Sequence, residues 1–490
     1  MYVSGREFMN ITTILLSLVL ILNIVFAFVV VFGERRDASS AWAWLLVLSF
    51  IPVLGFFLYL FLGQNLSRTR LFTWEDKKKI GIEQDIAYQL DQIRSGTFKY
   101  QKESEFNAQE LIFLHLLGND APLTRDNSVD IFTDGKEKFE QLLKDIASAK
   151  HHIHIQYYII KKDNLGKRIR DALIEKAKEG VKVRVLYDEL GSRGLSRKFF
   201  DELRQVGGEV EVFFPSKFRL INFRLNYRNH RKIVIVDGKT SYIGGFNIGD
   251  EYLGLNPRFG YWRDTHLRIH GTSVHAIQTR FILDWNQASN SHDIDYDPIL
   301  FPKPTSKDNV GMQIVTSGPD AEWSQIKNGY IKMISLAKES ILIQTPYFIP
   351  DASLLDTIRI ACLSGVDVKI MIPNKPDHIF VYWATLSHIG ELLKAGAQVY
   401  IYDNGFLHAK TVVIDDEVSS VGTANIDIRS LNLNFEINAF IYDRQIAKKL
   451  INAFNKDIEK SRLLTWAEYQ NRSKWIQLKE SVSRLLSPIL

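Results

Sequence analysis

The chain has 490 residues, a formal net charge of +5 and a single cysteine, Cys362. This length exceeds what one hydrophobic core normally supports, so two or more folded units are expected. One cysteine excludes an intrachain disulfide and is compatible with a cytoplasmic location. The small net charge is unevenly distributed, so its position along the chain matters more than its size.

The N-terminal segment, positions 1–70, does not look soluble. Residues 8–33 contain no charged side chain, and neither do residues 38–67. Each stretch exceeds the roughly 20 apolar residues that cross a bilayer core. The intervening "ERRD" is too short to fold alone, so residues 1–70 are predicted to form a transmembrane helical hairpin with spans at about 8–33 and 40–63.

Two other interpretations of this segment are less favourable. A cleaved signal peptide has a shorter apolar region and is not followed at once by a second one. Two buried core helices would each show a polar face at helical spacing, and neither stretch does. Pro52 and Gly55 in the second stretch are tolerated in membrane helices.

The orientation of the hairpin follows from its basic flanks. Arg6 precedes it, and only Arg35 and Arg36 lie between the spans. Five basic residues follow it: Arg68, Arg70, Lys77, Lys78 and Lys79. This excess predicts that both outer ends and the large remainder of the chain lie in the cytoplasm.

Beyond a predicted helical connector at residues 71–110, the chain alternates helix and strand, and it does so twice. A helix at 138–150 leads to a strand at 152–160, and a helix at 325–340 leads to a strand at 341–350. A second strand follows in each copy, "VKVRVLYD" and "VDVKIMIP". This repetition of one order of elements predicts two duplicated α/β domains, 111–300 and 301–490, joined by a polar, proline-containing linker.

Each predicted domain ends its pattern in a motif. "NHRKIVIVDGKTSYIGGFN" spans positions 229–247, and "LHAKTVVIDDEVSSVGTAN" spans positions 407–425. His230 and Lys232 are two apart on a β-branched run, so a strand directs both to one face. His408 and Lys410 repeat this arrangement.

A hairpin completes each patch. A turn at Gly238 and Lys239 pairs residues whose numbers sum to 477, which predicts His230 opposite Asn247. A turn at residues 416–417 likewise predicts His408 opposite Asn425. Each copy would therefore present an imidazole, an ammonium and an amide together.

The carboxylates of the two motifs are expected to lie far from this patch. The intervening length of strand puts Asp237 and Asp415 about 23 Å from the histidines, too far for proton transfer, so they are expected to hold the turns. The carboxylates that orient the imidazoles must come from elsewhere. Asp264 in "YWRDTHL" and Glu436 in "NFEINAF" are the candidates.

The two stretches resemble the paired HKD motifs of the phospholipase D superfamily. The hairpin "AWAWLLVLSFIPVLGFFLYLFLG" followed by two such domains resembles bacterial cardiolipin synthases, and the similarity extends through "VRVLYDELGS" to the closing "SRLLSPIL". The resemblance implies two phospholipase D-like α/β sandwich domains that share one active site. The implied catalytic sets are His230, Lys232 and Asp237, and His408, Lys410 and Asp415.

The resemblance also implies a reaction. One histidine attacks the phosphodiester of phosphatidylglycerol, and the other protonates the departing glycerol. A second phosphatidylglycerol then takes the phosphatidyl group, giving cardiolipin. The lysines, Asn247 and Asn425 would gather the phosphate oxygens, so no metal and no cofactor is expected. The expected partners are phosphatidylglycerol and anionic lipids rather than nucleic acid, at the bacterial cell membrane.

Several alternatives use the same residues. A hydrolytic phospholipase D or a phosphatidylserine synthase differs only in the acceptor, and a nuclease of this superfamily has no use for a membrane hairpin. An inactive membrane scaffold is disfavoured because both copies keep every motif position. The sequence leaves open the oligomeric state and which histidine is the nucleophile, although the superfamily pattern favours His230.

Two further stretches indicate membrane contact. Residues 216–232 hold seven basic residues, counting His230, and no acid. They predict either a surface for anionic headgroups or a solvated loop. The C-terminal "SKWIQLKESVSRLLSPIL" places Trp475, Leu478, Val482 and Leu485 at helical spacing, which suits a membrane surface or packing on the second domain.

Overall fold

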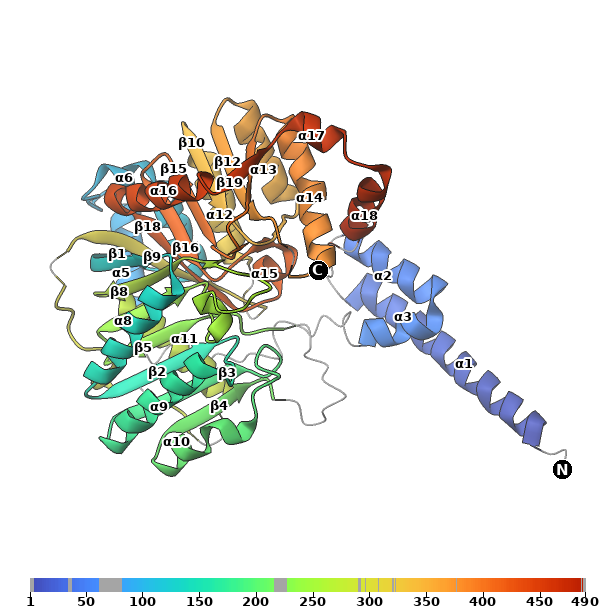
Figure 1. Ribbon diagram of the computed structural model, residues 1–490, viewed down its shortest axis with the longest axis horizontal. Coiled ribbons are helices and arrows are strands. Elements are labelled where there is room, and N and C mark those ends of the chain that lie inside the picture. The colour runs from blue at the N-terminus through green and yellow to red at the C-terminus, as the bar shows by residue number, and fades with distance from the viewer. Residues whose placement is uncertain are drawn as a thin grey trace. The chain divides into compact units, whose positions relative to one another are not determined.

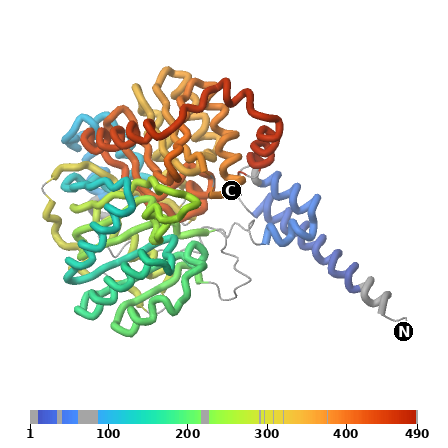
Figure 2. The backbone as a smooth tube through the Cα atoms, in the orientation of Figure 1, coloured from blue at the N-terminus to red at the C-terminus, as the bar shows by residue number. Residues whose placement is uncertain are grey.

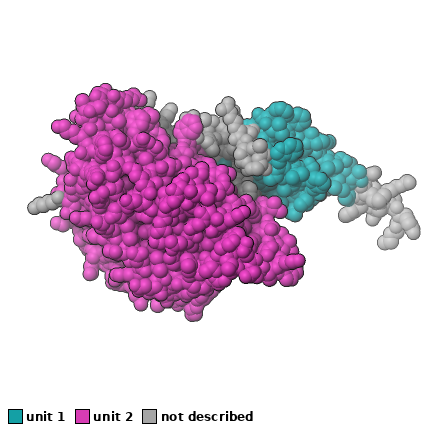
Figure 3. Space-filling model, turned by 90° about the horizontal axis from the view of Figure 1, so that it is seen from above, with its two compact units in different colours: residues 1–73, 216–227, 489 teal, residues 74–215, 228–488, 490 magenta. Residues whose placement is uncertain are grey.

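The computed structural model describes residues 4–33, 38–60, 82–215, 227–289, 292–295, 297–306, 308–319, 321, 323–375, 377–485 and 487. The chain divides into two compact units (Figure 3). The N-terminal unit comprises residues 1–73, 216–227 and 489, and the larger unit comprises residues 74–215, 228–488 and 490.

The N-terminal unit begins with one long apolar helix. Helix α1 (Ser4–Phe28) continues into a π-helical end, η1 (Val29–Gly33). Within it, Ile11–Gly33 has a mean hydropathy of 3.1 and is the one helix in the described part of the chain that is long and apolar enough to cross a membrane. This helix coincides with the first predicted span.

The second predicted span has a different form. Its described part consists of two short helices, α2 (Ala38–Phe50) and α3 (Pro52–Leu58), and residues 61–63 lie outside the described residues. The chain reverses between them. The Trp44 and Tyr59 rings meet edge to face at 5.5 Å, and a Cβ on Gly55 would lie 2.4 Å from the carbonyl oxygen of Val47. The two helices therefore run antiparallel, with their backbones in contact.

Proline explains where the reversal occurs. Pro52 has no N–H, so the carbonyl of Leu48, four residues earlier, loses its usual helical partner. Asn23 on α1 supplies a replacement, because its Nδ2 donates to the Leu48 carbonyl at 3.1 Å and to the Pro52 carbonyl at 2.8 Å. A polar side chain in the middle of the apolar helix thus satisfies the backbone that the turn leaves unpaired.

The larger unit is built on one 15-stranded sheet (Figure 1). The order of its strands is β19-β13-β12-β10-β15-β16-β18-β9-β1-β8-β6-β5-β2-β3-β4. Outward from the antiparallel β1–β9 junction, β1-β8-β6-β5-β2-β3-β4 on one side matches β9-β18-β16-β15-β10-β12-β13 on the other. The predicted duplicated α/β fold is confirmed, and the two copies share a continuous sheet.

The strands of the first repeat are β1 (Thr124–Phe132), β2 (His152–Tyr157), β3 (Lys182–Asp188), β4 (Glu209–Phe213), β5 (Ile233–Val236), β6 (Thr240–Gly244) and β8 (His266–His270). Those of the second are β9 (Val310–Ser317), β10 (Ser340–Gln344), β12 (Asp367–Pro373), β13 (Gln398–Tyr402), β15 (Thr411–Ile414), β16 (Val418–Gly422), β18 (Glu436–Tyr442) and β19 (Ser461–Leu464).

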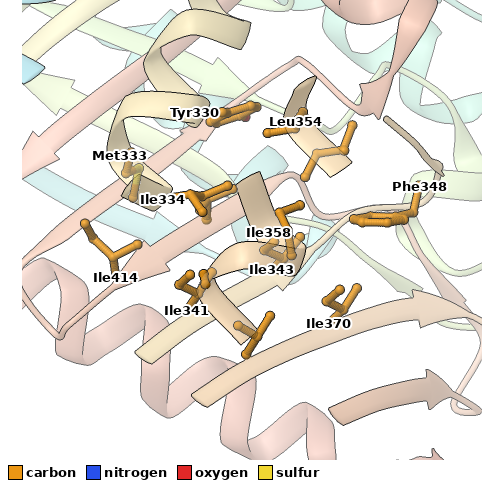
Figure 4. Close-up of a cluster of buried hydrophobic side chains, with 14 of the residues drawn as sticks. Tyr330, Met333, Ile334, Ile341, Ile343, Phe348, Leu354, Ile358, Ile370 and Ile414 are labelled. Atoms are coloured by element: carbon orange, nitrogen blue, oxygen red, sulfur yellow. The ribbon is translucent and has the colours of Figure 1, made fainter. Parts of the chain in front are cut away.

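Helices cover both faces of the sheet (Figures 1 and 2). In the first repeat α8 (Gly135–Ser148), α9 (Asn164–Lys178) and α10 (Asp201–Gln205) cover one face and α11 (Ser273–Ala288) the other. In the second, α12 (Gln325–Leu336), α13 (Ala352–Leu363) and α14 (Ile379–Lys394) cover one face and α16 (Arg444–Ile458) the other. Figure 4 shows the core of the second repeat, where Ile358 of α13 packs beside Ile343 of β10.

The remaining elements are short or lie outside this pattern. They are α5 (Ile82–Arg94), α6 (Glu103–Asn107), α7 (Gln109–Asn119), η4 (Arg197–Phe200), η5 (Asp250–Leu253), β7 (Trp262–Arg263), η6 (Pro298–Leu300), β11 (Phe348–Ile349), β14 (Phe406–Leu407), β17 (Ile426–Asp427), α15 (Ile428–Asn432), α17 (Trp466–Gln470) and α18 (Lys474–Leu485). Leu111 and Ile112 of α7 belong to the core of the second repeat, although α7 precedes the first. The domain division at residue 111 therefore stays a prediction.

Alternation along β2 shows how the two faces differ. Ile153 and Ile155 point into the apolar core under α8 and α9. His152 and His154 point to the other face, where each contacts Gln278 of α11, at 3.2 and 2.9 Å. Burial lowers the pKa of His152 to about 4, so this histidine is a neutral core residue rather than part of a site.

The predicted register of the first motif hairpin is wrong by one residue. Val236 pairs with Thr240, so partner numbers sum to 476 rather than 477. The turn has three residues instead of two, because Asp237 (φ 52°) and Gly238 (φ 62°) both adopt left-handed backbone before Lys239. Asn247 is therefore not the cross-strand partner of His230.

The second hairpin shows the same correction. Ile414 pairs with Val418, giving a sum of 832, and Asp415 and Asp416 have φ values of 49° and 48°. His408 and Asn425 are therefore not cross-strand partners. Two hairpins with the same unusual turn support duplication of the whole unit.

Candidate active site

The backbone brings the two motifs together by exchanging short strands. The His408 N–H donates to the Arg263 carbonyl at 2.7 Å, just after β14 pairs with β7. The His230 N–H donates to the Phe435 carbonyl at 3.0 Å. Each motif is thus attached to the segment that follows the motif of the other repeat.

The carboxylates that orient the histidines are exchanged in the same way. His230 Nδ1 lies 2.9 and 3.0 Å from the two carboxylate oxygens of Glu436, and His408 Nδ1 lies 2.6 Å from Asp264 Oδ2. Both carboxylates are fully buried. A carboxylate accepts only, so each Nδ1 carries a proton, and in the neutral form of either imidazole Nε2 keeps its lone pair. Each half-site therefore needs a carboxylate from the other repeat.

The two motif lysines lie in the same buried site. Lys232 Nζ donates to the His230 carbonyl at 2.6 Å, and Lys410 Nζ donates to the His408 carbonyl. Burial lowers the pKa of Lys232 to about 7 and that of Lys410 to about 8, and the nearby Glu436 and Asp264 oppose this effect. The charge of Lys410 also lowers the pKa of Lys232.

The charge states of the remaining groups follow from the same balance. Burial lowers the pKa of His230 to about 4 and also lowers that of His408, despite the adjacent carboxylates. Burial alone would raise the pKa values of Glu436 and Asp264, but their histidine and lysine neighbours lower them. At neutral pH His230 is therefore neutral and both carboxylates are ionised, which suits a histidine nucleophile.

The two half-sites differ at one position. Thr423 Oγ1 donates to Glu436 Oε2 at 2.6 Å. Its counterpart in the first motif is Gly245, where a Cβ would lie 1.9 Å from Asp264 Oδ1. Asp264 instead accepts from the Thr265 N–H at 2.7 Å. The only sequence signal is the contrast between "VGTAN" and "IGGFN", which sequence reasoning did not use.

Aromatic rings form walls beside the histidines. Tyr158, just after β2, has its ring centroid 4.9 Å from that of His230, and Lys232 Nζ lies 5.5 Å from the Tyr158 ring. Trp262 lies 5.1 Å from His408. Neither ring was predicted from the sequence, because their positions depend on the exchanged strands.

Two arginines that the sequence did not single out also lie beside this wall. Arg228 hydrogen-bonds to Tyr158, and with Arg429 it opposes the effect of burial, which raises the pKa of Tyr158. Burial and the charge of Arg228 lower the pKa of Arg429. The two guanidinium groups also interact with carboxylates, Arg228 with Asp188 and Arg429 with Asp427, which partly balance their charge.

Arg231 connects the first motif to two other elements of the larger unit. It is buried between His230 and Lys232, forms a salt bridge to Asp284 of α11 at 2.7 Å and donates to the Glu436 carbonyl at 3.1 Å. This side chain therefore connects α11 of the first repeat to β18 of the second.

The motif aspartates hold the sheet at the far end of each hairpin. Asp237 accepts from the backbone N–H groups of residues 150, 151 and 152 at 2.8, 2.7 and 2.9 Å. Asp415 accepts from those of residues 338, 339 and 340 at 2.7, 2.8 and 2.8 Å. These contacts fix the starts of β2 and β10, as expected for residues that hold the turns rather than transfer protons.

The two motif asparagines are buried but make local contacts. Asn247 Oδ1 accepts from the Ile159 N–H at 3.1 Å, next to Tyr158, and the Asn425 side chain hydrogen-bonds to Asp427. Within the described residues there is no group of three or more His, Cys, Asp or Glu side chains that could hold a metal ion. Of the basic stretch 216–232, residues 216–226 lie outside the described residues.

The lysine pKa values predict a pH profile. The ammonium forms are needed to neutralise a phosphodiester, and they exist below pKa values of about 7 and about 8. We therefore expect kcat/KM to fall as pH rises through this range, measured in phosphatidylglycerol micelles. In Lys410→Arg the second charge persists, so one of the two alkaline steps should disappear; an unchanged profile would contradict the assignment.

Thr423 is predicted to act as a positioning residue. Thr423→Val keeps the side-chain shape but removes the hydrogen bond to Glu436, so kcat should fall by about tenfold with KM nearly unchanged. Thr423→Ser keeps the hydroxyl and should restore the rate. Equal loss in both variants would indicate a packing role instead.

A duplicated sheet in which two His-Lys motifs share one buried site is the architecture of phospholipase D-type enzymes. The family model described as "Cardiolipin synthase, PLD-like domain" matches residues 142–267 and 330–458, and the model "Phospholipase_D-nuclease N-terminal" matches residues 21–64. The chain belongs to the bacterial cardiolipin synthase family of the phospholipase D superfamily.

Relatives and solved structures agree with this assignment. The major cardiolipin synthase ClsA of Bacillus subtilis is 69% identical over 482 residues, covering 98% of this chain and 100% of that protein. A cardiolipin synthase of Listeria welshimeri is 57% identical with the same coverage. The crystal structure of phosphatidylserine synthase from Haemophilus influenzae aligns with 79% of this chain and 100% of its own, with a TM-score of 0.60 at 15% identity, which shows the shared fold.

Proposed function

We propose that the protein makes cardiolipin by transferring a phosphatidyl group from one phosphatidylglycerol to another. The observation that carries this proposal is the pair of buried histidines, each hydrogen-bonded to a carboxylate of the other repeat, with a buried lysine on the backbone carbonyl of each. This arrangement suits a two-step displacement at phosphorus, and relatives of 69% and 57% identity are cardiolipin synthases.

The first step breaks the bond to glycerol. His230 Nε2, neutral because burial lowers its pKa, attacks the phosphorus of phosphatidylglycerol and forms a phosphorus–nitrogen bond. The oxygen of the departing glycerol takes a proton from His408 Nε2, whose imidazolium form is stabilised by Asp264. Lys232, Lys410, Asn247 and Asn425 neutralise or bind the phosphate oxygens as charge develops.

The second step releases the enzyme. His408, now neutral, removes the proton from a hydroxyl of a second phosphatidylglycerol, and this oxygen attacks the phosphohistidine. A phosphorus–oxygen bond forms, the phosphorus–nitrogen bond breaks, and His230 is regenerated with cardiolipin as product. Asp237 and Asp415 contribute by fixing the strands that bear the motifs.

The acceptor in this reaction is itself an anion, unlike water. Arg228 and Arg429, beside Tyr158 and His230, supply positive charge for its phosphate. This assignment distinguishes the synthase from a hydrolase that uses the same histidines, because only the synthase must hold two phosphodiesters at once.

The N-terminal unit anchors the enzyme at the bacterial cell membrane. The apolar helix Ile11–Gly33 and the basic residues that follow the hairpin support a catalytic unit on the cytoplasmic face. The sequence predicts an anchor that crosses the membrane more than once. In the structure, the described part of its second apolar segment is folded as α2 and α3.

The test is an assay of the purified full-length protein with phosphatidylglycerol as the sole lipid, in micelles containing a chelator. We expect cardiolipin and free glycerol in equal amounts. Phosphatidic acid as the main product would show a hydrolase, and a requirement for added serine would show a phosphatidylserine synthase. Activity that returned only with one specific divalent cation would contradict the metal-free reaction.

A further inference from the structure

The C-terminal helix α18 packs with its polar side inward. Glu480 is 2% exposed and Ser483 is 1% exposed, whereas Trp475 is 71%, Leu478 51% and Leu485 81% exposed. Most amphipathic helices bury their apolar side. The apolar stripe of α18 is completed by Val482, which is 46% exposed.

Polar contacts hold the helix in this orientation. Arg472 donates to both carboxylate oxygens of Glu480, at 2.9 and 2.8 Å. Arg484 donates to Glu391 of α14 at 2.8 Å, and Lys479 Nζ lies 5.1 Å from the ring of Trp383, also on α14. These contacts would be lost if α18 turned its apolar stripe toward α14. They therefore stabilise the orientation in which the stripe faces outward.

The neighbouring helix α14 also exposes apolar side chains. Ile379 and Phe380, in its first turn, are 65% and 54% exposed. Four exposed residues of α18 form what we call the apolar stripe surface: Trp475, Leu478, Val482 and Leu485.

Helix α14, on which α18 packs, begins near a catalytic lysine. Asp377, two residues before α14, hydrogen-bonds to the half-buried Tyr347 and opposes the burial that lowers the pKa of Lys410. Helix α14 therefore joins the catalytic region to the helix that carries the apolar stripe surface.

We propose that the apolar stripe surface inserts into the interfacial layer of an anionic bilayer and directs the active site toward its lipid substrates. Lys474 and Lys479 flank the stripe on either side, which is the arrangement that matches apolar side chains to acyl chains and ammonium groups to anionic phosphates. The proposal deepens the proposed function, because it rests on the substrates being membrane lipids.

The first experiment measures insertion without using activity. A fluorophore is attached at Leu478→Cys in a full-length Cys362→Ser background, in vesicles of phosphatidylglycerol and phosphatidylcholine with nitroxide-labelled acyl chains. The matched control is Gln477→Cys, an exposed position on another side of α18. Quenching at position 478 but not at 477 is expected. Equal quenching at both positions, or none at 478, would overturn the proposal whatever reaction the enzyme catalyses.

The second experiment measures the consequence for catalysis. In Leu478→Ser/Leu485→Ser, turnover of bilayer phosphatidylglycerol should fall by about tenfold, whereas turnover of monomeric short-chain phosphatidylglycerol should be unchanged. Equal losses on both substrates would show damage to the fold. A change from dimer to monomer in detergent, without quenching at position 478, would identify the stripe as a contact between two copies and contradict membrane insertion.

A second inference concerns the N-terminal unit and stands on different observations. Helices α2 and α3 form an antiparallel pair, and Asn23 pairs the carbonyls at their turn. Seventeen residues, 34–50, lie between the end of η1 and the reversal at Ile51 and Pro52, and at 1.5 Å per residue they reach at most about 26 Å as a helix, less than the roughly 30 Å of a bilayer core. We infer that α2 and α3 are a re-entrant hairpin and that the anchor crosses the membrane once, through α1.

The distribution of basic residues agrees with a single crossing. In this topology Arg35 and Arg36 join the five basic residues after the hairpin on the cytoplasmic side, giving seven against Arg6 alone on the other side. With two crossings, the division would be six against two. The single crossing therefore satisfies the charge rule better, and it puts the N-terminus outside.

Labelling of intact spheroplasts with a membrane-impermeant maleimide tests this topology. In the full-length Cys362→Ser background, Ser4→Cys should react in intact spheroplasts, and Ser95→Cys should react only after permeabilisation. If both react only after permeabilisation, the anchor crosses twice and the inference is wrong. Reaction of Ser95→Cys in intact spheroplasts would instead contradict the cytoplasmic placement of the catalytic unit.

Discussion

Replacing either histidine should remove turnover, because the two imidazoles perform different parts of one reaction. In His230→Ala the nucleophile is lost, and in His408→Ala the leaving glycerol has no proton donor. We expect each variant to lose at least about 10⁴-fold in cardiolipin formation, and the double variant to be little worse than either one, as for residues that act as a unit. Product analysis on phosphatidylglycerol micelles measures this.

The two variants should differ in what they accumulate. Radiolabelled phosphatidyl group should be trapped on the protein in His408→Ala when the substrate has a good leaving group that needs no acid, and it should be absent in His230→Ala. Label in His230→Ala but not in His408→Ala would exchange the two roles. A near-normal rate in either variant would exclude one shared site.

The second large effect should come from the exchanged carboxylates. In Asp264→Asn the side chain can no longer stabilise an imidazolium at His408, 144 residues away in sequence, and Glu436→Gln does the same to His230. A loss of about 10²- to 10⁴-fold in kcat is expected from the wrong tautomer and lost charge, with substrate binding less affected. Steady-state kinetics on micelles separates kcat from KM.

A matched control comes from the aspartates at the far ends of the hairpins. Asp237→Asn removes a carboxylate that bonds to three backbone N–H groups but touches neither histidine, so it should lower the thermal unfolding midpoint more than it lowers kcat in the protein that stays folded. A kcat loss in Asp237→Asn as large as that in Asp264→Asn would refute the assignment of roles between these carboxylates.

Local periodicity made the duplicated fold predictable. The order of helices and strands, read twice along the chain, gave the correct element types for α8, β2 and β3 and for their counterparts, because apolar spacing reflects burial of one face. The hairpin register was wrong, because two consecutive left-handed residues, Asp237 and Gly238 in one turn and Asp415 and Asp416 in the other, lengthened each turn by one residue. Turn geometry depends on backbone angles that composition only weakly constrains.

The second apolar segment shows a similar limit. Its hydropathy and length indicated a straight span, but Pro52 removes a helical hydrogen bond and Asn23, far away in sequence, offers a substitute. For the C-terminal segment, the sequence predicted an amphipathic helix but not which face of that helix points outward. Ionic contacts to Glu480 and Glu391 decide which face points outward.

The sequence by itself determined that two His-Lys motifs lie at equivalent places, just before β5 and β15, in two α/β repeats, because apolar periodicity and repeat spacing are local properties. It also named Asp264 and Glu436 as orienting candidates. Only the tertiary structure decided that each carboxylate serves the histidine of the other repeat, and that Tyr158, Trp262 and Thr423 complete the surroundings. The physical reason is that these contacts join segments 144 or 206 residues apart, and they form only when the two half-sheets merge along β1 and β9 and exchange short strands.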